Sequence, residues 1–270
     1  MTATLFLVTV LCVGLALCVG MSIAWVAWQR TRNSGWVDTV WTFSVGIVGL
    51  AGAVLPPTGA AALPSRRALV AVFAALWALR LGLHIARRTR GITDDPRYAA
   101  LLKGWGGDAW RQMFLLLQKQ ALVSIPLGLA MVLAASNPEP ALRLQDWLGV
   151  VVILVAVAGE AIADSQLRRF AANPANRGKV CDVGLWRWSR HPNYFFEWLG
   201  WLAYPLLAIG AWEWGWVALA APACMYWLLA HVSGIPPLEE HMIATRGDAY
   251  RAYQAQTSAF FPLPPDRRQG

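Results

Sequence analysis

Seven apolar stretches, separated by short polar segments, dominate the pattern of this chain. They cover residues 5–28, 37–55, 67–85, 114–135, 147–162, 194–209 and 214–232. A helix needs roughly 20 mostly apolar residues to cross a hydrocarbon core about 30 Å thick. We therefore predict an all-α fold, a polytopic membrane bundle of seven transmembrane helices that forms a single domain over residues 1–270.

Two polar interruptions refine this prediction. The fourth stretch contains Gln118-Lys119-Gln120 and then Pro126, and a proline inside a helix removes a hydrogen bond and kinks the chain. After the last stretch, residues 238–253 have the pattern of an amphipathic helix with a break near Gly247. We expect a kinked fourth span and an interrupted helix in the C-terminal tail.

The composition supports a membrane protein. Hydrophobic residues make up 57% of the chain, charged residues make up 14%, and the mean hydropathy is +0.44. Soluble proteins average roughly 25% charged residues. A compact soluble protein of this length could not bury so much apolar surface, and a disordered chain would be far less apolar. Both classes are excluded.

The positive charges predict the orientation of the bundle. Among the loops and the tail that would share one side, we count 18 Lys and Arg residues, whereas the loops on the other side hold 3. Cytoplasmic loops carry the excess of positive charge. We expect an integral membrane protein with the N-terminus outside and the C-terminus inside. The first residues carry no positive segment, so we expect no cleaved signal peptide.

Cysteine and histidine residues do not suggest a metal site. The four cysteines form no C-x-x-C pair, and the four histidines are scattered without the short spacings of multi-histidine iron sites. We expect no metal ion and no disulfide framework. We also expect no nucleic-acid partner.

One inner segment, residues 164–197, alternates cations, hydrogen-bonding groups and aromatic rings. It includes Arg168, Lys179, Trp186 and the run Arg190-His191-Pro192-Asn193-Tyr194, which leads into the sixth stretch. Phosphates bind Arg and Lys, whereas nucleotide bases bind flat rings and amide groups. Together with the tail at 238–262, this segment is our candidate site for a nucleotide cofactor on the cytoplasmic side.

Simpler explanations exist for several of these residues. Asp164 and Arg168 are spaced to form an ion pair along one helix. Arg80 and His84 lie one turn apart in the third stretch, where an arginine near a membrane boundary can extend to lipid headgroups. The tail residues Glu239 and Glu240 suit an amphipathic helix on the membrane surface, or a lid whose carboxylates meet the arginines of the segment.

Two residues of the N-terminal half are candidate proton donors. Asp38 begins the second stretch, where loss of hydration can keep a carboxyl group protonated. Tyr98 follows Asp94-Asp95-Pro96-Arg97 in the third loop. The alternatives are a charge at a helix N-terminus for Asp38 and an ordinary interfacial tyrosine for Tyr98.

The run from Gly184 to Glu197 resembles a loop-to-helix signature shared by steroid 5-alpha-reductases, delta-14 sterol reductases and isoprenylcysteine methyltransferases. Asp164, Arg168 and the tail from Glu239-Glu240 to Phe260-Phe261-Pro262 match the same superfamily in order and spacing. The chain looks most like the bacterial steroid 5-alpha-reductase-like membrane proteins, and this resemblance implies an integral protein of a bacterial inner membrane. The resemblance covers about residues 159–262 and is weaker in the N-terminal half.

The resemblance implies an NADPH site in the inner half of the bundle and a steroid or similar enone lipid that enters from the bilayer. It implies that the following residues contact the cofactor: Arg80, Asp164, Arg168, Lys179, Arg190, His191, Asn193, Tyr194 and Glu197. We add His84, Trp186, Glu239, Glu240 and Tyr253 to this set. Asp38 stands where the eukaryotic reductases have a Gln-Glu pair, and Trp77 lies near the position of their substrate-binding tyrosine.

We therefore expect an oxidoreductase that reduces a carbon–carbon double bond conjugated to a ketone, with NADPH as hydride donor and Asp38 or Tyr98 as catalytic acid. The alternative within the same fold is an S-adenosylmethionine-dependent methyltransferase acting on isoprenylcysteine or a lipid. That cofactor carries no phosphate, so it leaves the many arginines with less to neutralise. A sterol-binding or transport protein is a third hypothesis, but it predicts charges near the middle of the bilayer.

Overall fold

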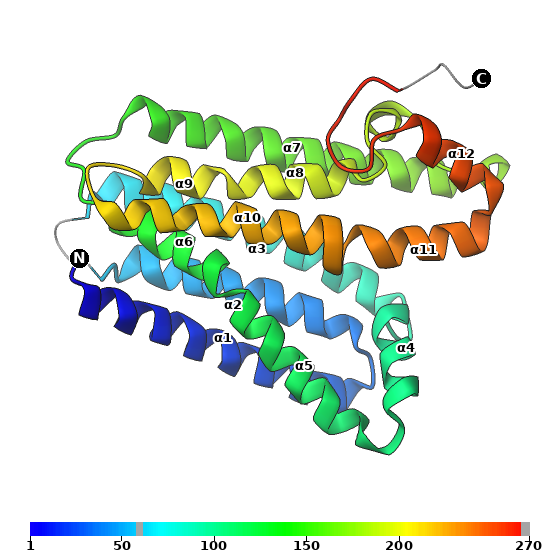
Figure 1. Ribbon diagram of the computed structural model, residues 1–270, viewed down its shortest axis with the longest axis horizontal. Helices are drawn as coiled ribbons and strands as arrows, with labels where there is room; N and C mark the ends of the chain where they lie inside the picture. Colours follow the sequence, from blue (N-terminus) through cyan, green and yellow to red (C-terminus); the bar gives the residue numbers. More distant parts are fainter. Residues whose placement is uncertain (58–61, 266–270) are drawn as a thin grey trace. The chain divides into compact units, whose positions relative to one another are not determined.

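The computed structural model describes residues 1–57 and 62–265, and within them the fold is all-helical, with one isolated bridge between Gly210 and Trp212 in place of any strand. The α-helices are α1 (Ala3–Thr31), α2 (Gly35–Val54), α3 (Pro64–Arg90), α4 (Pro96–Trp105), α5 (Ala109–Val123), α6 (Ile125–Ser136), α7 (Leu144–Ala172), α8 (Pro192–Trp201), α9 (Ala203–Ala208), α10 (Ala220–Trp227), α11 (Ile235–Arg246) and α12 (Asp248–Gln256). Figure 1 shows them in chain order.

Six helical stretches in the described part are long and apolar enough to cross a membrane. They are Ala3–Thr31, Gly35–Val54, Pro64–Arg90, Arg97–Ser136, Leu144–Ala172 and Glu213–Arg246. An integral membrane protein is thus supported by six spans. The predicted sixth stretch, 194–209, is helical as well, but α8 and α9 are each too short to be counted among the six.

The predicted interruptions are confirmed. The fourth stretch breaks between α5 and α6 at Ser124, with Pro126 in the first turn of α6. The Ser124 hydroxyl accepts a hydrogen bond from the Trp41 indole at 2.8 Å and donates one to the Gln120 carbonyl at 2.7 Å. The tail helix breaks at Gly247, whose positive φ of 56° suits glycine.

The chain packs as two compact units, which we describe separately. Unit 1 comprises residues 1–149 and 204–221, and unit 2 comprises residues 150–203 and 222–270. In unit 1, α2 lies beside α1, α3 and α6 (Figure 1). A Cβ atom at Gly46 would lie 2.4 Å from the Ala78 side chain, and one at Gly49 would lie 2.1 Å from Met131. Small residues therefore let α2 approach its neighbours closely, as is usual in membrane bundles.

Unit 1 also contains a buried ion-pair network at the N-terminal end of α3, here called the Arg66 network. Arg66 is fully buried, and its guanidinium donates to the Asp146 carboxylate at 3.0 and 3.3 Å. It also donates to the carbonyls of Glu139 and Ala141 at 2.8 and 2.6 Å. Arg143 adds a second cation to Asp146. These partners neutralise a charge that would be very costly to bury alone.

In unit 2, α7 and α8 lie side by side (Figure 1), and a Cβ atom at Gly159 would lie 2.4 Å from the Phe196 ring. The segment before α8 is tied to residues that follow α12. Its Arg190 amide donates to the Ser258 carbonyl at 2.8 Å, and the Leu263 amide donates to the Trp188 carbonyl at 2.9 Å. The C-terminal tail is therefore an integral part of this unit.

Candidate functional site

The candidate site in unit 2 is built where an irregular segment becomes α8. Pro192 occupies the first turn of α8, where its missing N–H needs no partner. A 3₁₀ turn over Gly184–Arg187 precedes it and begins with a positive φ of 60° at Gly184. His191 is the residue that precedes α8, and Asn193 is the second residue of the helix.

Arg190 holds the tail against this segment. All three guanidinium nitrogens donate within the chain: Nε donates to Glu239 Oε1 at 2.7 Å, Nη2 donates to Glu239 Oε2 at 3.3 Å, and Nη1 donates to the carbonyls of Gln254 and Thr257. Of the two alternatives that the sequence left open for the tail, the structure shows the contact between a tail glutamate and an arginine of the segment, and Glu239 makes it. These donors are occupied, so we assign Arg190 the role of positioning its neighbours.

His191 is buried beside the same carboxylate, with only 2% of its surface exposed. Its Nε2 lies 3.0 Å from Glu239 Oε1. A carboxylate that already accepts from Arg190 can only accept here, so we assign the proton to Nε2. Burial lowers the pKa of His191 below its ordinary value, and this outweighs the attraction of Glu239. In the neutral ring, Nδ1 is then a hydrogen-bond acceptor, and it has no partner among the described residues.

Asn193 presents a second acceptor of the same kind. Its amide nitrogen lies 3.5 Å from Asp164 Oδ1 on α7, and its buried Oδ1 has no hydrogen-bond partner in the part of the chain that the structure describes. The opposite orientation of the amide would bring two oxygen acceptors together, so the carboxylate fixes Oδ1 as the free end.

The two acceptors indicate what a ligand would have to supply. Buried polar atoms in proteins are almost always hydrogen-bonded, and leaving one unpaired costs about 1 to 3 kcal/mol. His191 Nδ1 and Asn193 Oδ1 both lack an N–H or O–H donor. A group with N–H donors, such as a primary amide or an exocyclic amine, would satisfy them.

Four other predicted residues of unit 2 have internal contacts. The Tyr194 ring stacks on His191 at 5.5 Å, and the Trp201 indole donates to Glu197 at 3.0 Å. The Trp186 indole donates to the Ala163 carbonyl at 2.9 Å, and the Tyr253 hydroxyl donates to the carbonyl of Trp186. Tyr194 thus shapes the ring environment of His191, whereas Trp186 and Tyr253 fasten the segment to α7 and α12.

Three further predicted residues are exposed in unit 2, namely Arg168 on α7, Lys179 in the segment and Glu240 on α11. Glu240 follows Glu239 in sequence, but the hydrogen bonds from Arg190, His191 and Gln254 all go to Glu239. The polar contacts of α11 to the segment are therefore made by Glu239 in preference to its neighbour.

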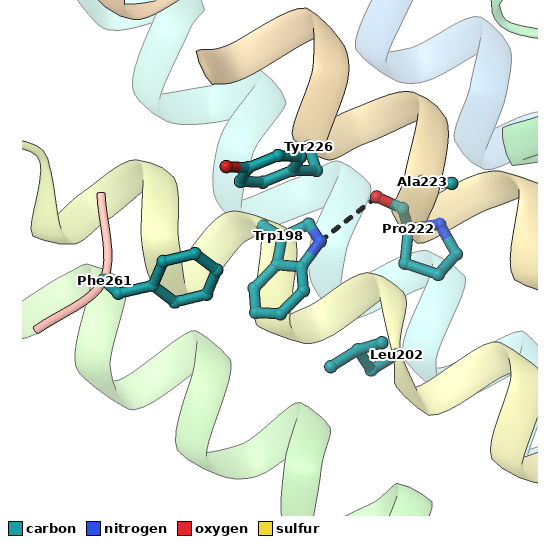
Figure 2. Close-up of a pocket in the computed structure, with 6 residues that line it drawn as sticks. All are labelled: Trp198, Leu202, Pro222, Ala223, Tyr226 and Phe261. Atoms are coloured by element: carbon teal, nitrogen blue, oxygen red, sulfur yellow. Dashed lines mark hydrogen bonds between the residues drawn. The ribbon is translucent and has the colours of Figure 1, made fainter. Parts of the chain in front are cut away.

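An aromatic pocket of about 490 Å³ is also part of unit 2. Figure 2 shows it lined by Trp198, Leu202, Pro222, Ala223, Tyr226 and Phe261. The Trp198 indole donates to the Pro222 carbonyl at 3.1 Å, and the Tyr226 and Phe261 rings stack at 5.9 Å. Apart from the Tyr226 hydroxyl, the drawn side chains offer apolar surface, so this pocket suits a hydrocarbon ligand.

In unit 1, the two predicted proton donors contact each other. The Tyr98 hydroxyl donates to Asp38 Oδ1 at 3.2 Å, and the Gln120 amide donates to the Tyr98 oxygen at 3.1 Å. Arg97 makes ion pairs with both Asp38 and Asp95, the latter at 3.0 Å. Asp38 therefore has two partners, the Arg97 guanidinium and the Tyr98 hydroxyl. The Tyr98 hydroxyl donates to Asp38 and accepts from Gln120.

The remaining predicted residues, Arg80 and His84, lie one turn apart on α3 in unit 1, and both are half-buried. Their spacing places them on one helical face, as predicted. In the described residues, no group of three His, Cys, Asp or Glu side chains could hold a metal ion.

Sequence reasoning missed three residues that complete these networks. Arg97 and Gln120 fix Tyr98 and Asp38, and Gln254 donates to Glu239 Oε2 at 2.7 Å. Arg97 had a local signal because it adjoins Tyr98 in the same polar run. Gln120 also had a local signal, because Gln118-Lys119-Gln120 interrupts an apolar stretch. Gln254 had none, since its partner Glu239 lies 15 residues earlier in the chain.

Comparison with known proteins gives the family of this chain. An uncharacterised protein of Schizosaccharomyces pombe (strain 972 / ATCC 24843), C594.04c, is 25% identical over 282 positions, which cover 89% of this chain and 76% of that protein. No solved structure matches the chain. Residues 24–257 match the family described as "Protein of unknown function (DUF1295)". The chain belongs to the DUF1295 family.

Proposed function

We propose that this protein is a membrane reductase that uses NADPH to reduce a carbon–carbon double bond conjugated to the ketone of a steroid or similar lipid. The observation that carries the proposal is the pair of unpartnered acceptors, His191 Nδ1 and Asn193 Oδ1, at the start of α8. The family is one that includes steroid 5-alpha-reductase-like proteins, which is consistent with this activity.

The residues present fit a nicotinamide cofactor. Its carboxamide would supply the N–H donors that His191 and Asn193 lack, with Asp164 keeping the Asn193 amide in place. When bound, NADPH supplies a hydride. Burial keeps the His191 ring neutral, and the hydrogen bond to Glu239 orients it so that Nδ1 is the acceptor.

The reaction also needs a proton, and we assign it to Tyr98. Gln120 donates to the phenol oxygen while Asp38 accepts from it, so the hydroxyl is held from both sides. Arg97 keeps Asp38 in place through an ion pair. A phenol positioned in this way can donate a proton to the oxygen of an enone or polarise it, which would stabilise negative charge on that oxygen.

The proposal includes a topology and a route for the substrate. We propose seven spans, with α8 and α9 together forming the sixth, an outside N-terminus and an inside C-terminus. This arrangement would place residues 164–197 and the tail in the cytoplasm, where NADPH is available. A lipid enone would enter from the bilayer, and the aromatic pocket offers an apolar surface of suitable chemistry.

Purified protein in detergent tests this function directly. We expect NADPH oxidation, followed at the absorbance of the reduced nicotinamide, when a 3-oxo-4-ene steroid is added. Tyr98→Phe should lower kcat at least about a hundredfold while NADPH binding stays unchanged. Tyr204→Phe, which also removes a buried phenol hydroxyl from unit 1, is the matched control and should retain activity. If the wild-type protein oxidises no NADPH with any enone lipid, the proposal is wrong.

One observation favours a second candidate, the S-adenosylmethionine-dependent methyltransferase. The guanidinium of Arg190 is occupied by Glu239, so it is not a free cation that requires a phosphate. The adenine amine of S-adenosylmethionine could also satisfy the two acceptors. Thermal stabilisation by S-adenosylmethionine and not by NADPH would favour this candidate.

A further inference from the structure

A second hollow in unit 2, of about 650 Å³, opens between residues 178–187 and α12. We call it the α12 hollow. Its lining residues are Gly178, Lys179, Val180, Asp182, Val183, Arg187, Ala249, Ala252, Tyr253, Gln256, Thr257 and Pro265. Its volume lies within the range of about 300 to 1,000 Å³ that is usual for small-molecule sites.

The charges of the α12 hollow favour an anion. Lys179 and Arg187 are both exposed, and neither forms an ion pair with any residue that the structure describes. Asp182 is the one carboxylate of the lining, so the cations are in excess. Cations in a concave surface attract anionic ligands more strongly than cations on a convex one.

The walls of the α12 hollow are fixed by hydrogen bonds. The Leu185 amide donates to Gln166 Oε1 at 2.9 Å, which ties the segment to α7. The Tyr253 hydroxyl donates to the Trp186 carbonyl, which ties α12 to the same turn. The hollow is therefore preformed, and a ligand would not have to order it first.

The lining has the three kinds of surface that a nucleoside phosphate requires. The two cations can bind phosphate oxygens, and Asp182 can accept a hydrogen bond from a ribose hydroxyl. The Gln256 amide and the apolar side chains of Val183 and Ala249 offer a polar edge and a flat apolar wall for a base. A simple inorganic anion would use only the cations.

We propose that the α12 hollow binds a nucleoside phosphate, with Lys179 and Arg187 on a phosphate monoester. This inference rests on the proposed function. In that reaction, Lys179 and Arg187 recognise the 2′-phosphate of NADPH. Arg187, which sequence reasoning did not select, becomes a specificity-determining residue. The hollow thereby sets the preference for NADPH over NADH.

Binding measurements on the full-length protein in neutral detergent test the inference without turnover. The probes are NADPH, NADH, 2′-AMP and 5′-AMP, each added to wild type and to the double variant Lys179→Ala/Arg187→Ala. The readouts are the dissociation constant from calorimetry and the ligand-induced shift in Tm. Arg251→Ala is the matched control, because Arg251 is exposed on α12 but does not line the hollow.

We expect wild type and Arg251→Ala to prefer NADPH over NADH and 2′-AMP over 5′-AMP. In the double variant, affinity for NADPH and 2′-AMP should fall about ten- to a hundredfold, while NADH affinity changes less than about threefold. Without ligand, its Tm should equal that of wild type, since both side chains are exposed.

Other results overturn the inference. The first is an unchanged preference for NADPH over NADH in the double variant, and the second is no binding of 2′-AMP to wild type. The third is stabilisation by micelles containing phosphatidylglycerol that depends on Lys179 and Arg187, while the nucleotides have no effect. The last result would assign the hollow to a lipid headgroup. Selective NADPH binding without any enone reduction would leave the inference standing and contradict only the proposed reaction.

Discussion

Two arginines, the fully buried Arg66 in unit 1 and the partly buried Arg190 in unit 2, are each paired with a carboxylate and with backbone carbonyls. Around Arg66, every polar neighbour that we have named is partnered, including Asn137, whose amide donates to the Leu207 carbonyl at 2.7 Å while its oxygen accepts from the Glu139 amide at 3.1 Å. Around Arg190, His191 Nδ1 and Asn193 Oδ1 have no hydrogen-bond partner among the residues that the structure describes. The first network closes on itself, as a structural element does. The second leaves acceptors for another molecule.

Arg66→Ala should have the largest effect on stability. It removes a buried cation from Asp146 and hydrogen-bond donors from the carbonyls of Asn137, Glu139 and Ala141. Breaking a buried ion pair costs about 3 to 5 kcal/mol. We expect this loss in the free energy of unfolding by denaturation in mixed micelles. The neighbouring Arg67→Ala, whose guanidinium donates only to the carbonyls of Ala53 and Val54, should cost about 1 kcal/mol. Equal losses in the two variants would contradict our view of the Arg66 network.

Glu239→Gln should come next. The amide cannot accept at both positions, so Arg190 and His191 lose their common partner, and we expect a loss of about 2 kcal/mol in the free energy of unfolding. Glu240→Gln, at the exposed neighbouring position, should stay within about 0.5 kcal/mol of wild type. The same denaturation experiment measures both, and a large effect at Glu240 would show that α11 packs differently.

A pair of asparagine variants tests the comparison itself. Asn137→Ala should cost about 2 kcal/mol in the free energy of unfolding, because it leaves a buried carbonyl and a buried amide unpaired, and it should leave NADPH affinity unchanged. Asn193→Ala should cost less than about 1 kcal/mol and weaken NADPH binding about tenfold. Unfolding and calorimetric binding are measured on both. The reverse pattern would remove the main support for the cofactor site.

The smallest expected effect is a pH dependence from His191. Its pKa lies below the ordinary 6.5 because burial disfavours the imidazolium. The unfolded chain takes up a proton near pH 6.5, whereas the folded chain does so only at a lower pH. The free energy of unfolding should therefore decrease as the pH falls from 6.5 through the folded pKa.

Thermal unfolding between pH 5 and 8 measures this dependence. His191→Gln, which can still donate to Glu239, should be less sensitive to pH in this range, whereas His241→Gln, at an exposed position of α11, should behave as wild type. A pH dependence that is identical in His191→Gln and wild type would assign the effect to another group.

The hydrophobic pattern predicts most of the helices because burial in a bilayer depends on local composition. Residues 5–28 and 37–55 correspond to α1 and α2 within a few residues. The pattern underestimates α7, which continues beyond residue 162 to Ala172, since a helix does not have to end where the apolar residues end. Residues 194–209 read as one stretch, although the helix is interrupted at Leu202.

The candidate sites were predictable only in part, for a physical reason. Sequence periodicity shows which residues share a helical face, so the spacing of Arg80 and His84 was predictable. It does not show which faces meet. The hydrogen bond between Asp38 and Tyr98 joins residues 60 positions apart, and the Arg190–Glu239 pair joins residues 49 apart. The nearby acceptors His191 Nδ1 and Asn193 Oδ1 can be recognised as unpaired only when the positions of the surrounding side chains are known.

The distance along the chain between Arg190 and its partners has a consequence for biosynthesis. Glu239 is made 49 residues after Arg190, and Phe260, whose carbonyl accepts from Ser189, is made 71 residues after that serine. At a synthesis rate of about 5 to 20 residues per second, Arg190 waits about 2 to 10 s for its carboxylate. A ribosome stalled before α11 would therefore hold a nascent chain in which Arg190 and Ser189 still lack these partners.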